Sequence, residues 1–312
     1  MQIDLYNNQK FEVKPFLKWA GGKTQLIKDI ESSLPKEIKK TKEIKYYFEP
    51  FVGGGAIFFY LVGAYNIKEA FLYDINKELI LAYNAVKNDP EDLINLLMKM
   101  EKNFLAKNDV DRKEYFLDIR KKFNDDVPSF NFEKYSPDHV KRAAYTIFLN
   151  KTCFNGLFRL NKNGEFNVPM GRYKNPKICD SKNIRNVSEC LQIAKIFNCS
   201  FKTSKDLINN ESLVYLDPPY RPLNKTSNFT SYSENEFNDK EQEELAQYFD
   251  KITDKGAKAI LSNSDPKNED ENDDFFDELY SNYNIVRVKA KRFINSNAKK
   301  RGPINEIIVR NY

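Results

Sequence analysis

Four consecutive residues, Asp217-Pro218-Pro219-Tyr220, have the groups needed to activate a weakly nucleophilic aromatic amine. They follow the apolar run 213–216, which predicts a buried strand. An amino group on an aromatic ring reacts poorly because its lone pair is delocalised into the ring. Asp217 and the carbonyl of Pro218 can each accept one amino hydrogen and free that lone pair. The prolines fix φ, and Tyr220 can stack on a base. We therefore predict these four residues to be catalytic.

A glycine-rich turn at residues 48–55, Phe-Glu-Pro-Phe-Val-Gly-Gly-Gly, follows a short strand signal and precedes a helical one. Glycines allow a ligand to approach the backbone at the carboxyl end of a strand, where α/β sheets bind cofactors. Asp74 ends the next apolar run, where a carboxylate can accept ribose hydroxyl hydrogens. Phe58 occupies the last position of the dinucleotide fingerprint, so a nucleoside without pyrophosphate suits the turn better. A plain structural turn is the alternative.

Several other chemistries are disfavoured by the residues present. Gly22-Lys23-Thr24 resembles the end of a phosphate-binding loop, but Leu17 stands where the earlier glycine is required. The four cysteines form no C-x-x-C pair, and His139 is the only histidine. We expect no metal site and no Ser-His-Asp triad, and we expect His139 on the surface.

Charge is distributed unevenly along this chain of 312 residues, whose net charge is +5. Residues 141–177 contain eight basic side chains and one acid, and residues 287–301 contain seven basic side chains and no acid. Between them, residues 265–278 contain eight acids and one lysine. The two basic segments could bind a polyanion, although a solvated surface is the simpler interpretation.

Alternating strand and helix signals predict an α/β domain interrupted by an insert. Strand signals lie at 45–48, 70–73, 213–216, 258–261, 285–288 and 307–309. From about 76 to 148 the apolar spacing is helical. Asn163-Gly164 within 157–168 then predicts a two-stranded hairpin, with positive φ at both turn residues. We expect one domain built from residues 1–81 and 191–312, with a second domain at 82–190.

The sequence resembles the Dam-type, D12-class (alpha group) DNA adenine-N6 methyltransferases over nearly the whole chain. The resemblance rests on residues 16–23, 48–55, Asp74, the hairpin, 217–220 and the basic tail loop. It implies a Rossmann-like S-adenosylmethionine-dependent methyltransferase sheet with a mostly helical target-recognition insert. It also implies methyl transfer from S-adenosyl-L-methionine to adenine N6 in duplex DNA, directly and after base flipping. The implied cofactor-binding residues are Trp19, Lys23, Glu49, Phe51, Gly53, Gly55, Asp74, Asp206 and Asp217.

The hairpin region carries the expected DNA-reading residues. Arg159 can bind guanine O6 and N7, Leu157 and Pro169 can contact a thymine methyl, and Phe154 can wedge into the base stack. The family resemblance adds a target containing GAT, with GATC favoured over a longer site. We also expect residues 221–232 to cover the flipped adenine. The full set of expected DNA-binding residues is Phe154, Asn155, Leu157, Arg159, Pro169, Arg172, Lys299, Lys300 and Arg301.

Two rival functions stay open. The acceptor could be cytosine N4, although Asp217 in place of serine favours adenine. The chain could also be a DNA-binding module without catalysis, against which the intact Asp217, Tyr220, Asp74 and Lys23 argue. No apolar run is long enough to span a bilayer. We expect a cytoplasmic monomer from a bacterium, archaeon or phage, with a separate cognate restriction endonuclease as an optional partner.

Overall fold

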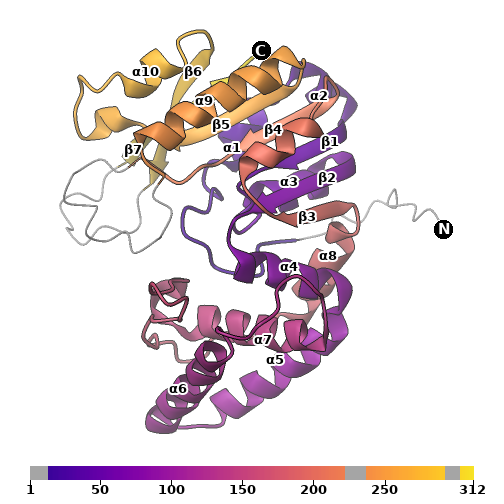
Figure 1. Ribbon diagram of the computed structural model, residues 1–312, viewed down its shortest axis with the longest axis vertical. Helices are drawn as coiled ribbons and strands as arrows, with labels where there is room; N and C mark the ends of the chain where they lie inside the picture. The colour runs from indigo at the N-terminus through magenta and orange to yellow at the C-terminus, as the bar shows by residue number, and fades with distance from the viewer. Residues whose placement is uncertain (1–12, 222–236, 292–302) are drawn as a thin grey trace.

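A seven-stranded sheet forms the upper half of the computed structural model (Figure 1), which describes residues 13–221, 237–291 and 303–312. The strand order is β3-β2-β1-β4-β5-β7-β6. Strand β7 is antiparallel to both of its neighbours, and every other pair is parallel. The strands are β1 (Glu43–Glu49), β2 (Asn66–Asp74), β3 (Ala194–Asn198), β4 (Ser212–Leu216), β5 (Lys258–Ser264), β6 (Asn284–Lys291) and β7 (Pro303–Arg310). The expected Rossmann-like sheet is therefore confirmed.

Successive residues of the central strands point into two separate cores, one on each face of the sheet. Tyr47 and Leu213 belong to one buried cluster, whereas Phe48 and Val214 belong to the other. This alternation follows from the pleat of a strand, which turns neighbouring side chains to opposite faces. Helices α1 (Ile27–Ser32), α3 (Ala56–Ala64) and α4 (Lys77–Asn88) contribute to the first core. Helices α9 (Asp239–Asp254) and α10 (Phe275–Leu279) contribute to the second.

A group of helices lies below the sheet in Figure 1 and shares the first core with it. The group comprises α5 (Pro90–Leu105), α6 (Asp109–Asp125), α7 (Pro137–Thr152) and α8 (Ser181–Leu191). Asn108 caps α6 by accepting hydrogen bonds from the first free backbone amides, as Asn76 does for α4. The helical spacing of residues 76–148 predicted α4 to α7. Helices α1, α2 (Lys36–Thr41), α8 and α10 and strand β3 were not predicted.

The region between α7 and α8 differs in detail from the expected hairpin. No strand forms there. Two isolated bridges, Cys153–Met170 and Leu160–Phe166, and a few backbone hydrogen bonds hold its arms together. Gly164 has φ of 77°, but Asn163 does not have positive φ. The Gly164 amide donates to Asn161 O, so the turn is a longer one with a single left-handed residue. The expectation of positive φ at both positions was wrong.

His139 is also not where the sequence suggested. It lies in the first turn of α7 with only 4% of its surface exposed. Its Nδ1 accepts a hydrogen bond from the Ser136 amide, so its polarity is used to cap the helix rather than to face water. No metal-binding group of three or more His, Cys, Asp or Glu side chains occurs in the described ranges. No helix among them could cross a membrane.

Candidate active site and DNA-reading surface

The glycine turn after β1 and the end of β2 meet through one carboxylate. Asp74 Oδ2 accepts a hydrogen bond from the Gly53 amide at 3.1 Å, and Oδ1 accepts one from the Asn76 amide at 2.8 Å. Gly55 has φ of 71°, and a Cβ there would lie 2.5 Å from the hydroxyl of Tyr83. That hydroxyl donates to Gly53 O at 3.1 Å. The turn therefore requires glycine both for its backbone conformation and for its close packing.

Residues 217–220, which we predict to be catalytic, follow β4, next to β1 in the sheet, and a lysine from near the N-terminus contacts them. Lys23 Nζ lies 2.5 Å from Asp217 Oδ1, with Lys23 4% and Asp217 19% exposed. The same ammonium lies 4.6 Å from the centroid of the Tyr220 ring. Ser262 on β5 donates to Asp217 Oδ1 at 3.5 Å. Asp217 is therefore partly open to solvent and oriented by two donors.

Burial and charge compete in this group. Burial raises the pKa of the Asp217 carboxyl, and the Lys23 ammonium opposes part of that rise. Burial would lower the pKa of Lys23, but the charges of Asp217, Tyr220 and Glu306 outweigh it, so that pKa is raised. Lys23 therefore stays protonated and favours the ionised, hydrogen-bond-accepting form of Asp217.

A buried side-chain amide also donates a hydrogen bond to the backbone of residues 217–220. Gln242, on α9, is fully buried and donates from Nε2 to Pro219 O at 3.1 Å. Its Oε1 accepts from Asn263 Nδ2 of β5 at 3.3 Å. Sequence reasoning missed Gln242, Ser262 and Asn263. The signal available for the latter two was a polar pair inside an otherwise apolar strand.

The other expected cofactor residues occupy different environments. Trp19 packs beside the turn, because a Cβ on Gly53 would lie 3.0 Å from the Trp19 ring. Phe51 contacts Phe201 and Phe237. Glu49 is 2% exposed and accepts a hydrogen bond from Tyr47, and burial raises its pKa well above the ordinary range.

Asp206 ends the short helix η2 (Phe201–Asp206) and is exposed. No hydrogen bond in the described ranges joins it to Asp74.

The expected DNA-reading residues lie on one compact segment after α7. The Phe154 amide donates to Pro169 O, and the Gly171 amide donates to Thr152 O, which closes the segment at its base. The turn η1 (Phe154–Gly156) contains Asn155 with φ of 56°. Phe154 is 52% exposed. The exposed members of the expected set are Phe154, Asn155, Leu157, Arg159, Pro169 and Arg172.

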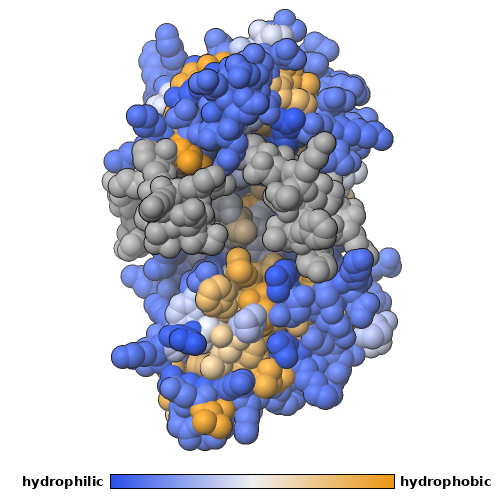
Figure 2. Space-filling view, turned by 90° about the vertical axis from the view of Figure 1, so that its left-hand side faces the viewer, coloured by the Kyte–Doolittle hydropathy of each residue, from blue (hydrophilic) through white to orange (hydrophobic). Residues whose placement is uncertain are grey.

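The surface around this segment combines charge and apolar area. Arg159 Nε donates to Asn167 Oδ1 at 2.8 Å, which extends the guanidinium along the segment. Figure 2 shows apolar side chains gathered on the helical half of one face, with hydrophilic ones around them. Lys299, Lys300, Arg301 and residues 222–232 lie outside the described residues.

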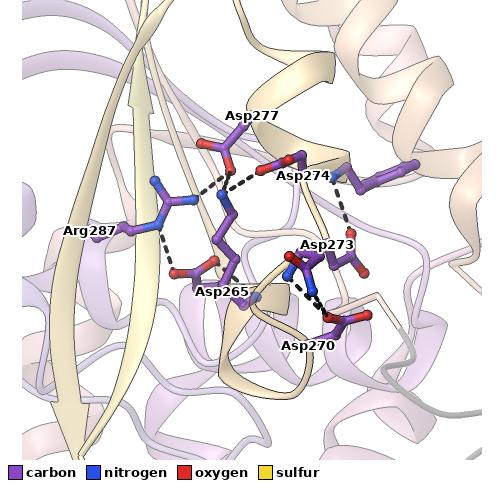
Figure 3. Close-up of polar contacts among 9 residues, drawn as sticks. Asp265, Asp270, Asp273, Asp274, Asp277 and Arg287 are labelled. Carbon is purple, nitrogen blue, oxygen red and sulfur yellow. Dashed lines mark hydrogen bonds and ion pairs between the residues drawn. The ribbon is translucent and has the colours of Figure 1, made fainter.

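Two basic side chains counted in the polyanion-binding segments are already paired within the protein. Arg142 is 1% exposed and forms a bidentate ion pair with Glu78. Arg287 lies between Asp265 and Asp277 (Figure 3), with its Nε and Nη2 2.9 and 2.6 Å from their carboxylates. The acidic stretch therefore neutralises part of the second basic segment, and neither arginine is available to bind a phosphate.

The last residue before residues 222–236, Arg221, is fixed by acids as well. It forms a bidentate ion pair with Asp239 and a third contact with Asp273, each with a shortest distance of 2.6 Å. Its guanidinium also lies 4.2 Å from the centroid of the Phe275 ring. The ion pair with Asp239 therefore attaches the residue that follows 217–220 to the start of α9.

The fold is that of an α/β protein in which the predicted catalytic carboxylate follows β4 and the glycine turn follows the neighbouring strand β1. The model of the D12 class N6 adenine-specific DNA methyltransferases matches residues 19–294. The chain belongs to that family, and it is an adenine-specific DNA methyltransferase.

Relatives from archaea and bacteria align over almost the whole chain. The type II methyltransferase M.MjaIII of Methanocaldococcus jannaschii is 51% identical over 302 residues, covering 96% of this chain and all of that protein. The type II methyltransferase M1.LlaDCHI of Lactococcus lactis subsp. cremoris is 38% identical and covers 99% of each chain. The DNA adenine methylase of Escherichia coli K12 is 32% identical and covers 95% of this chain and 94% of its own.

Proposed function

We propose that this enzyme transfers the methyl group of S-adenosyl-L-methionine to adenine N6 at GATC in duplex DNA, after flipping the base. The observation that carries the proposal is the 2.5 Å ion pair between Lys23 and Asp217 in a partly open turn. It orients an ionised carboxylate where an exocyclic amine could donate to it. Pro218 supplies a backbone carbonyl beside it.

The residues present fit a nucleoside cofactor. The Asp74 carboxylate accepts two backbone amides at the carboxyl end of β2, which suits a ribose-binding acceptor. Trp19, which packs against Gly53, and Phe51, which belongs to the glycine turn, supply apolar surface for the rest of the molecule. S-adenosyl-L-methionine supplies an electrophilic methyl group on a sulfonium.

The chain's own groups then prepare the acceptor nitrogen. Asp217 and Pro218 O accept the two amino hydrogens, so the lone pair is released from the ring toward the methyl carbon. Bound S-adenosyl-L-methionine would supply the methyl group to this nitrogen, which would then give up one proton to solvent. Tyr220 stacks on the flipped base, while the Lys23 charge keeps Asp217 ionised.

Target recognition in this proposal belongs to residues 82–190, and the catalytic domain comprises 1–81 and 191–312. Arg159 reads a guanine, Leu157 and Pro169 contact a thymine methyl, and Asn155 and Arg172 hold the backbone or a base edge. Phe154, whose side chain is 52% exposed, fills the stack left by the flipped adenine. Lys299, Lys300 and Arg301 bind phosphates. A longer site that contains GAT is the rival to GATC.

We further propose that the enzyme acts as a cytoplasmic monomer, alone or with a separate restriction endonuclease of the same specificity. A DNA-binding module without catalysis is the alternative class. The intact Asp217, Tyr220, Asp74 and Lys23 argue against it.

The test is nucleoside mass spectrometry of unmethylated plasmid DNA after incubation with protein and S-adenosyl-L-methionine. Wild type should produce N6-methyladenine, and Asp217→Ala should produce none while still binding DNA. Digestion with GATC-sensitive restriction enzymes then tests the site. N4-methylcytosine would refute the acceptor, partial protection of GATC sites would favour the longer site, and absence of cofactor binding would refute the whole proposal.

A further inference from the structure

Asn150, in the last turn of α7, is a completely buried side chain that joins two distant segments. Its Oδ1 accepts a hydrogen bond from the Lys18 amide at 2.9 Å. Its Nδ2 donates to Lys18 O at 2.8 Å and to Gly156 O at 2.9 Å. One amide thus binds both backbone groups of an N-terminal residue and one backbone group of the turn η1.

Each of those segments leads to a different part of the site. Lys18 begins a stretch of chain that ends at Lys23, which contacts the catalytic Asp217. Gly156 closes the turn that carries Phe154 and Asn155. Asn150 therefore lies where the segment that supports catalysis meets the segment expected to read DNA.

Residues 18–19 and 156–158 also pack closely against each other. A Cβ on Gly156 would lie 2.4 Å from Lys18 Cδ and 2.8 Å from Lys18 Cβ. The Trp19 ring stacks on Phe158, with centroids 5.6 Å apart and an interplanar angle of 22°. A shift of the reading turn must therefore move residues 18 and 19, or break the contacts made by Asn150.

Only an amide side chain of this length satisfies all three partners. A carboxylate keeps the acceptor but has no hydrogens for the carbonyls of Lys18 and Gly156. An aliphatic side chain leaves every one of the three backbone groups without its partner in a buried position. The position therefore demands asparagine for its hydrogen bonds, not for its volume.

We propose that Asn150 is a positioning residue that fixes residues 18–23 against the target-reading turn, so that correct target contacts set the geometry at Asp217. This rests on the proposed function, because it assumes that residues 154–172 read DNA. In this inference Asn150 contacts neither DNA nor the methyl donor. It nevertheless links discrimination between DNA sequences to the rate of methyl transfer.

The experiment measures kcat/KM for the full-length enzyme on short duplexes that contain the preferred site or a version with one base changed. In Asn150→Asp, the rate at the preferred site should fall about tenfold or more, as loss of two buried hydrogen bonds predicts. The ratio of kcat/KM at the preferred site to kcat/KM at the altered site should fall about tenfold as well. Thr152→Val is the matched control, since Thr152 is buried on the same helix and its hydroxyl bonds only to Phe148 O.

A purely structural role predicts a different result. Asn150→Asp would then lower the melting temperature and the amount of active enzyme, as we expect of Thr152→Val, and the ratio of kcat/KM between the two sites would be unchanged. That outcome would overturn the inference. Gly156→Ala disturbs the contact between Gly156 and Lys18 through a new Cβ. It should also reduce the ratio of kcat/KM between the preferred and altered sites if the inference holds. A wild type that methylates neither duplex would refute the proposed function instead.

Discussion

Lys23 and Asp217 are far apart in the sequence, yet their charged atoms lie 2.5 Å apart at the carboxyl edge of the sheet. Lys23 is the more buried of the two, at 4% exposure, and it also faces the ring of Tyr220. A buried lysine is costly unless it is paired. Its role is therefore electrostatic, since it favours the ionised form of Asp217 and orients the carboxylate that we propose accepts an amino hydrogen.

The first prediction concerns pH. Burial raises the pKa of Asp217 and Lys23 partly offsets the rise. Because the ionised form is the acceptor, kcat/KM should increase with pH through a pKa above the ordinary value of about 3.9 for aspartate. In Lys23→Met the offset disappears, so the rising limb should move to higher pH and the maximal rate should fall. The pH–rate profiles of both proteins test this, and superimposable limbs would contradict it.

The second prediction concerns the glycine turn. Gly55→Ala should destabilise the protein and weaken S-adenosyl-L-methionine binding, because the new Cβ would lie 2.5 Å from the Tyr83 hydroxyl at φ of 71°. The left-handed conformation alone costs about 1–2 kcal/mol for alanine. Thermal unfolding and isothermal titration with the cofactor provide the measurements.

The double variant Gly55→Ala/Tyr83→Phe separates the two causes. Removal of the hydroxyl relieves the contact but also removes the hydrogen bond to Gly53 O. Part of the lost stability should return, whereas the backbone cost and the 2.9 Å contact with the Phe59 ring should remain. If the losses of the two single variants simply add in the double variant, steric conflict with the Tyr83 hydroxyl is not the cause.

Local patterns predicted the parts of the site that lie on single strands. Asp74, Asp217 and the glycine turn are recognisable because each directly follows an apolar run. The pairing of Lys23 with Asp217 could not be predicted from spacing, since only the tertiary fold brings the residues together. Ser262 was missed for the same reason.

The wrong predictions share a cause as well. His139 lies in a polar stretch, but it is buried because it caps a helix. Arg142 and Arg287 looked like free surface charge, but each is paired with acids from other elements. A polar residue in a sequence needs hydrogen-bonding partners. The sequence alone does not show whether water or other protein groups provide them.

The third prediction concerns the buried ion pair of Glu78 and Arg142, which joins α4 to α7. Arg142 is also stacked near Phe123, with its guanidinium 4.2 Å from the ring centroid. Arg142→Met leaves a buried carboxylate without its partner, so the free energy of unfolding should fall by about 3–5 kcal/mol. Urea denaturation measures the loss. Glu78→Leu/Arg142→Met removes both charges and should recover much of it, and a double variant as unstable as the single one would argue against this account.

The last prediction concerns the dependence of stability on pH near the base of the reading segment. Burial, and then the charge of Lys18, lower the pKa of Lys151 from its ordinary 10.5 to about 8. Between those values the unfolded chain binds more protons than the folded one, so the free energy of unfolding should rise with pH from about 8 to 10.5. Below pH 8 the folded protein carries a poorly solvated ammonium, which destabilises it. Lys151→Met should therefore be more stable than wild type at pH 7.

Urea denaturation at pH 7, 8, 9 and 10 tests this on the protein without DNA. The rise with pH should be smaller in Lys151→Met than in wild type, and the two proteins should approach equal stability at the alkaline end. Lys121→Met is the matched control, because Lys121 lies on α6 with 74% of its side chain exposed. It should retain the wild-type dependence on pH. A Lys151→Met variant with an unchanged pH dependence would contradict the prediction, because it would mean that the Lys151 ammonium is well solvated in the folded protein and keeps a pKa close to that of the unfolded chain.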